Sequence, residues 1–272
     1  MTDYLSRLSE PEVAGFYRRL AASIQAKFGG DSLAAILLLH WLDGKGRTKV
    51  YPARYVKDLV EVRDHLQNVA RPIFLSAKKT PSGIIGGIVP RIKAAAKSAQ
   101  LNSRHKMHLE GNVETPLSIQ AKAYVGMNVD PRELDALYAL HGFTVISDVT
   151  VITVKSCGLS VFGKSRTTGP PGLLLSQCNG PEVYDVSFER WICKASDEYH
   201  WNPEKHINVP NPDFGSKDQG AIAPDESTIT VYHSNAIRLE KAGLAKSFHD
   251  ESEPWEENTD IKVCGKATVT VS

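Results

Sequence analysis

The chain has 272 residues, of which 42% are apolar and 23% charged, and its formal net charge is +1. Such a chain is long enough to fold as one large or two small domains without a metal ion or disulfide to hold it together. A charge near zero gives no overall attraction for a polyanion, so a partner of that kind would need a local basic patch.

No apolar segment of signal-peptide length stands near the N-terminus, and the most apolar run, residues 33–39, is too short to cross a bilayer. We therefore expect a protein that is cytoplasmic as made and has no transmembrane segment, while export without a leader stays open. The spacing of the cysteines matches no common zinc motif, so we expect reduced thiols and no cofactor. Two disulfides in an oxidising compartment are the alternative. The cysteines are Cys157, Cys178, Cys193 and Cys264.

The first helix is well marked in the sequence. Ser9 and Glu12 have the spacing of a capping box, and Pro11 stands in the first turn, where proline is tolerated. Apolar residues then recur every three or four positions as far as Phe28, and the glycines that follow predict the end of the helix.

Two more helices are expected in residues 1–71, which we interpret as a helical part. The second begins at Asp31 or Ser32 and is apolar on nearly all sides through Trp41, so it is expected to be central. The third is predicted to run from Pro52 to Val69 at helical spacing. Short connections between the helices favour a small bundle or a helical cap over a sheet.

Residues 72–109 are interpreted as a basic connector, because a glycine- and proline-rich apolar stretch gives way there to a cationic segment. Between His65 and Leu109 there are eight lysines and arginines and no carboxylate. Such a stretch can meet the phosphates of a nucleic acid or an anionic lipid surface. Alternatively, it faces water or packs near the acidic cluster of residues 250–260. The candidate binding residues are Arg91, Lys93, Lys97, Arg104 and Lys106.

After residue 110 the apolar residues mainly alternate, as in strands with one buried face. Residues 110–272 are therefore predicted to form a strand-rich, mostly antiparallel domain, which makes the chain an α+β protein. One helix is expected between Asp130 and Gly142. A long proline-rich loop is expected at 202–224. Strands are predicted at 117–125, 143–154, 183–193, 229–232 and 262–271.

A cluster of imidazole and carboxylate groups follows the predicted strand that ends near residue 193. Asp197, His200, His206 and His233 could converge if the intervening loop folds back, with Glu198 as a second carboxylate. These residue types can bind a divalent metal or perform acid–base catalysis. The histidines do not have the spacing of a metal motif, so the alternative interpretation is that all three are surface or turn residues.

Residues 231–252, which begin Val-Tyr-His-Ser-Asn-Ala-Ile-Arg-Leu, resemble the closing motif of an uncharacterised bacterial family. Genes of that family often stand beside type VI secretion and polymorphic-toxin genes. The family's motif contains a strand, an Asn/Ser turn, a basic helix, a glycine and a phenylalanine. Its usual Gly-Gly-Asp before the phenylalanine is replaced here by Leu244, Ala245 and Lys246.

The resemblance implies a secretion or competition context and supplies no site residues. We therefore expect a secretion-associated effector or binding protein that acts through contacts with a protein or an anionic surface, and an interbacterial toxin is one version of it. The alternative is a metal-dependent hydrolase that uses the His/Asp cluster at 197–233. A third hypothesis, nucleic-acid binding through the basic connector, predicts an affinity that falls steeply with salt.

Overall fold

The computed structural model describes residues 2–72, 107–118, 131–140, 142–156, 182–218, 220–258 and 267–271. These residues belong to two compact units. The first unit comprises Met1–Arg63, Pro116–Val145 and Lys194–Glu253, and the second comprises Asp64–Thr115, Ile146–Cys193 and Pro254–Ser272. Segments from before and after residue 110 therefore contribute to both units.

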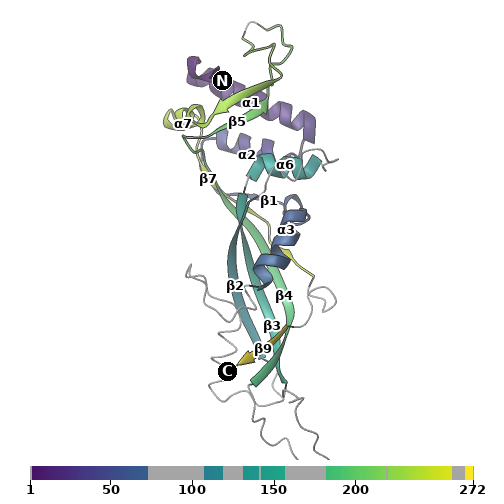
Figure 1. Cartoon of the computed structure of the whole chain (residues 1–272). Helices are drawn as coiled ribbons and strands as arrows, with labels where there is room; N and C mark the ends of the chain where they lie inside the picture. The colour runs from purple at the N-terminus through teal and green to yellow at the C-terminus, as the bar shows by residue number, and fades with distance from the viewer. Residues whose placement is uncertain are drawn as a thin grey trace, which may run out of the picture. The chain divides into compact units, whose positions relative to one another are not determined.

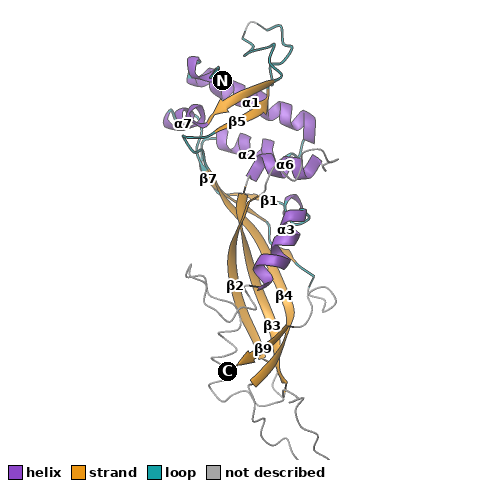
Figure 2. Cartoon of the chain, viewed as in Figure 1, coloured by secondary structure: helices purple, strands orange, loops and turns teal. Residues whose placement is uncertain are grey.

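Helices come mainly from the first part of the chain and strands mainly from the later part, so the α+β prediction is confirmed (Figures 1 and 2). Within the described ranges, no helix combines the length and apolar character that a membrane span requires. The α-helices are α1 (Glu10–Phe28), α2 (Leu33–Leu42), α3 (Val60–His65), α6 (Pro131–Leu140) and α7 (His233–Lys241). The short helical turns are η1 (Leu5–Arg7), η2 (Ala53–Tyr55) and η3 (Leu66–Ala70). The strands are β1 (Lys49–Tyr51), β2 (Met107–Ser118), β3 (Gly142–Ser156), β4 (Glu182–Tyr199), β5 (His206–Pro210), β6 (Thr228–Tyr232), β7 (Phe248–Ser252), β8 (Trp255–Glu256) and β9 (Ala267–Val271).

The capping residues of α1 behave as the sequence predicts. The backbone N–H of Ser9 donates to Glu12 Oε2 at 2.8 Å, and the capping box is complete. The helix ends at Gly29, whose φ of 105° is a conformation that favours glycine. The first predicted helix is therefore confirmed at both ends.

The third predicted helix is wrong as a continuous element. A 3₁₀ turn (η2) is followed by non-helical residues, and regular α-helix begins only at Val60 and passes into the π-helical turn η3. Val56, with φ −125°, leaves the helical conformation while its side chain is fully buried. Helix propensity is low for aromatic and β-branched residues such as Tyr55 and Val56, so tertiary burial decides the backbone at this break.

In the first unit, α1, α2 and α6 pack together, and α7 contacts both α1 and β6 (Figure 1). Arg238 on α7 donates to the backbone carbonyls of Leu5, Ser6 and Leu8 at 2.8–3.2 Å. These bonds join carbonyl groups in and just after η1 to α7 and so attach the N-terminal segment to that helix. The largest fully buried side chains of this unit are those of Leu5, Phe16, Tyr17, Leu33, Leu37, Trp41 and Tyr51.

The strands of the first unit combine parallel and antiparallel pairing. β7 lies between β1, with which it is parallel, and the end of β4, with which it is antiparallel. β5 and β6 form a separate antiparallel pair. Neither β1 nor β5 was expected, because β1 has only three residues and β5 lies inside the proline-rich stretch predicted to be a loop.

In the second unit, β4 pairs in antiparallel fashion with β8 and β9, and it is followed in the sheet by β3 and then β2. His65 is bonded to Thr115 at 2.8 Å, and burial lowers the pKa of this histidine. Cys193 is buried beside Ser147 as a free thiol, and burial raises its pKa to about 12. It is therefore an unreactive core residue. Cys157, Cys178 and Cys264 lie outside the described residues.

Candidate functional site

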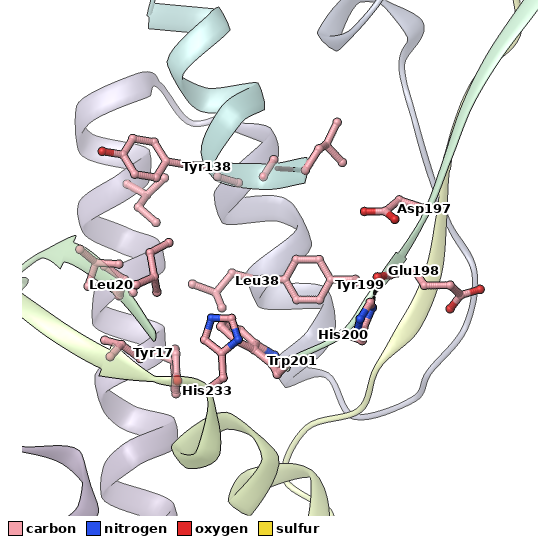
Figure 3. A pocket seen from close by; sticks show the side chains of 17 residues that line it. Tyr17, Leu20, Leu38, Tyr138, Asp197, Glu198, Tyr199, His200, Trp201 and His233 are labelled. Carbon is pink, nitrogen blue, oxygen red and sulfur yellow. Dashed lines mark hydrogen bonds between the residues drawn. The ribbon is translucent and has the colours of Figure 1, made fainter. Parts of the chain in front are cut away.

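A cavity of about 120 Å³ lies within the first unit (Figure 3). Helices α1, α2 and α6 provide one part of its lining, and the ends of β4, β5 and β6 with the start of α7 provide the rest. We call it the first-unit pocket. Its lining residues are Tyr17, Leu20, Ile24, Ala34, Leu38, Tyr138, Ala139, Leu140, Asp197, Glu198, Tyr199, His200, Trp201, Ile207, Val209, Val231 and His233.

The helical side of the pocket is held in place by a carboxylate that joins two helices. Asp135 on α6 is buried and accepts hydrogen bonds from Ser32 Oγ at 2.5 Å and from the N–H groups of Leu33 and Ala34 at 2.6 and 3.2 Å. These N–H groups belong to the first turn of α2 and have no partner within their own helix. A negative charge there also interacts favourably with the helix dipole. These bonds hold α6 against the first turn of α2, where Ala34 lines the pocket.

Aromatic rings form much of the opposite side. The ring centroid of Trp201 lies 5.2 Å from that of Trp41, 6.0 Å from that of Tyr17 and 4.8 Å from that of His233. Tyr199 stacks on Phe248 with centroids 4.9 Å apart. Such offset and edge-to-face contacts restrict the rings, so the wall is rigid as well as apolar.

A carboxylate enters this otherwise apolar lining from β4. Successive side chains of a strand point to opposite faces. Figure 3 accordingly shows Asp197 turned toward the pocket and Glu198 turned away. On the outer side, Glu198 Oε1 lies 3.0 Å from His249 Nδ1, and Lys194 is paired with Glu251 at 2.7 Å.

A second carboxyl group, that of Asp250 on β7, lies next to Asp197 across the strand pair. The two residues are direct partners in the antiparallel β4–β7 register. Asp250 has no exposed surface, and neither of its carboxylate oxygens has a hydrogen-bond partner among the described residues. A buried carboxylate without a partner is strongly destabilised relative to its protonated form.

Burial, with the nearby charges of Asp197 and Glu198, raises the pKa of Asp250 to about 8. Burial also raises the pKa of Asp197 to about 6, although a hydrogen bond from the Glu198 backbone and the nearby His200 act in the opposite direction. The two groups interact, so their titrations belong to the pair rather than to either residue. We call Asp197 and Asp250 the carboxyl pair, and near neutral pH it holds about one proton.

Two tyrosines, the buried Tyr51 and the partly buried Tyr199, complete the surroundings of the carboxyl pair. The pKa values of Tyr51 on β1 and Tyr199 on β4 are raised by burial and, secondarily, by Asp250. Tyr51 Oη is itself buried without a partner among the described residues. Both phenols therefore stay protonated near neutral pH, where the carboxyl pair changes its charge.

The structure brings three of the four predicted catalytic residues to this pocket. Asp197, His200 and His233 line it, whereas His206 is exposed on β5 with its ring 5.5 Å from that of Tyr232. His200 Nδ1 lies 2.7 Å from the carbonyl oxygen of Glu198, and His233 Nδ1 accepts the N–H of Asn202 at 3.2 Å. Over the described ranges, no three His, Cys, Asp or Glu side chains are grouped as metal ligands.

The other predicted site could not be placed. Arg91, Lys93, Lys97, Arg104 and Lys106 all lie outside the described residues. Sequence reasoning missed Asp250, which it counted as one member of an acidic cluster. The available signal was the alternation Phe248, Asp250, Ser252, all three buried on one face of β7.

Comparison of the chain with protein families, curated proteins and solved structures finds no match.

Proposed function

We propose that this chain is a binding protein that holds a small ligand, or a single side chain of a partner, in the first-unit pocket. The observation that supports this proposal is the composition of the lining, which is apolar and aromatic with its few ionisable groups gathered where β4 ends and α7 begins. Ligand sites typically combine an apolar lining with a few placed polar groups. The apolar part supplies affinity, and the polar edge fixes the orientation.

The size of the pocket limits what it can hold. At about 120 Å³ it is smaller than the pocket of a drug-sized ligand. An apolar cavity of about 150 Å³ can hold one benzene molecule. The ligand, or the part of it that enters, is therefore about the size of one aromatic ring with a short substituent.

Binding of a neutral ring-sized probe tests the proposal. We expect 2-phenylethanol to bind the wild-type protein with a stoichiometry of one in isothermal titration calorimetry. Ala34→Leu adds a larger side chain to the lining and should abolish binding, while Ala22→Leu, on the exposed side of α1, should not. Absence of binding to the wild-type protein would contradict the proposal.

We further propose that the protein works in a bacterial secretion or competition system as an effector or adaptor. This context rests on the resemblance of residues 231–252 alone. Those residues include the end of β6, all of α7 and all of β7, and Val231 and His233 among them line the first-unit pocket. Expression in bacteria with delivery to the cytoplasm or to the periplasm tests it. Harm in neither compartment would contradict the toxin version and leave an adaptor.

Hydrolysis at the same pocket is the second candidate function. It is favoured by Asp197, whose pKa of about 6 suits proton transfer near neutral pH, together with His200 and His233 on the same lining. Purified protein would be analysed for bound zinc and for cleavage of chromogenic carboxylic and phosphate esters. Activity that survives both His200→Ala and His233→Ala would end this candidate.

A further inference from the structure

The charge of the first-unit pocket is one-sided. The residues that line it include Asp197 and Glu198 but no lysine or arginine. On the paired strands, Lys194 is engaged with Glu251 at 2.7 Å on the other face, and Lys49 on β1 is the register partner of Asp250. An anionic ligand would therefore meet a carboxylate without a compensating cation, which makes a negatively charged occupant unfavourable.

The carboxyl pair favours a cationic group in the ligand. Asp197 faces the pocket, and Asp250 stands directly across the strand pair with both oxygens buried and without partners among the described residues. The ionisable groups around Asp250 are its register partner Lys49 and Tyr51 on β1, and Asp197 and Tyr199 on β4. Glu198, His249 and Glu251 lie on the outer face of β4 and β7. His249 contacts Glu198 and Glu251, and neither oxygen of Asp250 accepts a hydrogen bond from Lys49 or from any other described residue.

The aromatic wall suits a cation in the same place. Rings of tryptophan and tyrosine attract an ammonium group through their π-faces, and the attraction increases when water is excluded. Tyr199 and Trp201 follow Asp197 closely on the chain, with ring centroids 6.0 Å apart. An ammonium group beside Asp197 would thus be close to both a carboxylate and aromatic rings.

We propose that the first-unit pocket binds a primary amine on a ring-sized apolar body, with the ammonium group at Asp197 and the body between α1, α2 and α6. This inference rests on the proposed binding function and specifies the chemical class of its ligand. Asp250 acts through Asp197, because its ionisation adds a second negative charge behind the one that the ammonium group contacts. Asp197 contacts the ammonium group directly, and Asp250 is a positioning residue that changes only the charge beside that contact.

Paired titrations with 2-phenylethylamine and 2-phenylethanol, which differ only in the cationic group, test the inference. At about pH 7 we expect the amine to bind about tenfold or more tightly than the alcohol, as one unscreened charge contact allows. Asp197→Asn should reduce the ratio of the two affinities to about one. Glu251→Gln removes a carboxylate from the opposite face of β7 and should leave the ratio unchanged.

The pH dependence separates a role of the carboxyl pair from a purely structural role. Wild-type affinity for the amine should rise between about pH 5 and about pH 9, since alkylammonium groups stay protonated in this range while the pair loses its protons. Asp250→Asn, which cannot ionise, should abolish the part of the rise above about pH 7 without changing the affinity for the alcohol.

Three outcomes would overturn the inference. Equal affinities for amine and alcohol would refute it while leaving the binding function intact, and binding of neither ligand would refute both. If the affinity of the wild-type protein for the amine does not change with pH, ionisation of the carboxyl pair does not contribute to binding, and the inference is refuted. Should Asp197→Asn fail to fold by circular dichroism, the Asp250→Asn pH profile still decides the question.

Discussion

Asp197 and Asp250 are direct neighbours across the β4–β7 strand pair, one facing the first-unit pocket and the other fully buried behind it. Like charges placed opposite one another in a sheet destabilise it, and a buried carboxylate without a hydrogen bond does so more strongly. A protein that keeps this pair therefore gives up stability at a site where a ligand could use the charge.

The first prediction concerns stability and pH. In the unfolded chain the pKa of Asp250 lies near 3.9, and in the folded protein it is about 8, so the folded state binds more protons between these values. The free energy of unfolding should consequently fall as the pH rises from about 4 to about 8. Asp250→Asn removes the titrating group, and urea denaturation at about pH 9 should show a variant more stable than the wild type by on the order of a few kcal/mol.

Glu253→Gln serves as its control, because Glu253 is exposed and its removal should leave the slope of stability against pH unchanged. A wild-type stability that does not decline over this interval would contradict the burial of an unpartnered Asp250.

The second prediction concerns the carboxylate that caps α2. Asp135→Ala leaves the N–H groups of Leu33 and Ala34 without their acceptor in a buried setting. We expect a loss of about 2–4 kcal/mol in the free energy of unfolding, measured by urea denaturation, since several charge-assisted bonds are removed together. Asp31→Asn, at an exposed position next to the same cap, should change stability by less than about 0.5 kcal/mol. Similar losses of stability in both variants would contradict a particular role of the Asp135 hydrogen bonds in stabilising the start of α2.

The third prediction concerns the loop between β5 and β6. Arg19 Nε and a second guanidinium nitrogen donate to the two carboxylate oxygens of Asp213 at 2.7 and 2.8 Å. Burial acts to raise the pKa of Asp213, but the bonds from Arg19 and from the N–H of Ile222 lower it overall. Because Arg19 is partly exposed, Arg19→Gln should cost only about 1 kcal/mol.

Amide hydrogen exchange should show the effect of Arg19→Gln more clearly than denaturation does. Compared with the wild type, we expect faster exchange in residues 211–226 and unchanged exchange in α2. Arg18→Gln, at the neighbouring exposed position of α1, is the matched control. Equal protection of the loop in wild type and Arg19→Gln would refute a role for the ion pair in holding it.

The fourth prediction concerns the basic connector, for which the sequence is the only guide. Exchanging Lys93 and Lys97 for glutamate removes two positive charges and adds two negative charges in a segment that contains no carboxylate. If this segment binds phosphates, affinity for anionic vesicles or oligonucleotides falls steeply with salt and falls further in the variant. Lys205→Glu, at an exposed site in the first unit, should have little effect. No binding by the wild type at low salt would end the hypothesis.

Local sequence signals predicted the elements whose ends are set by local chemistry. Ser9 and Glu12 mark the start of α1 and Ser32 that of α2, and in both cases hydrogen bonds act within a few residues. α6 begins at Pro131, a residue that favours the first turn of a helix. α7 also begins at His233 as predicted, although its N-cap residue, Tyr232, makes no capping hydrogen bond with its side chain.

Elements that depend on distant partners were not predictable in this way. β1 has three residues and exists through parallel pairing with β7, whose partner residues lie about two hundred positions later in the chain. β5 stands in a proline-rich stretch and is fixed by its register with β6. The site shows the same limit: Asp197, His200 and His233 could be proposed together from chain order, but the burial of Asp250 follows only from the pairing of β4 with β7.

The most direct test of the central claim, that the first-unit pocket binds a ring-sized ligand, is a methyl-selective NMR titration with 2-phenylethylamine. The account predicts saturable chemical-shift changes that are largest for the methyl groups of Leu20, Ala34, Leu38 and Val231. It also predicts that these changes disappear in Ala34→Leu, since the added side chain occupies the same space. Shifts confined to residues outside the pocket, or no saturation at all, would contradict it.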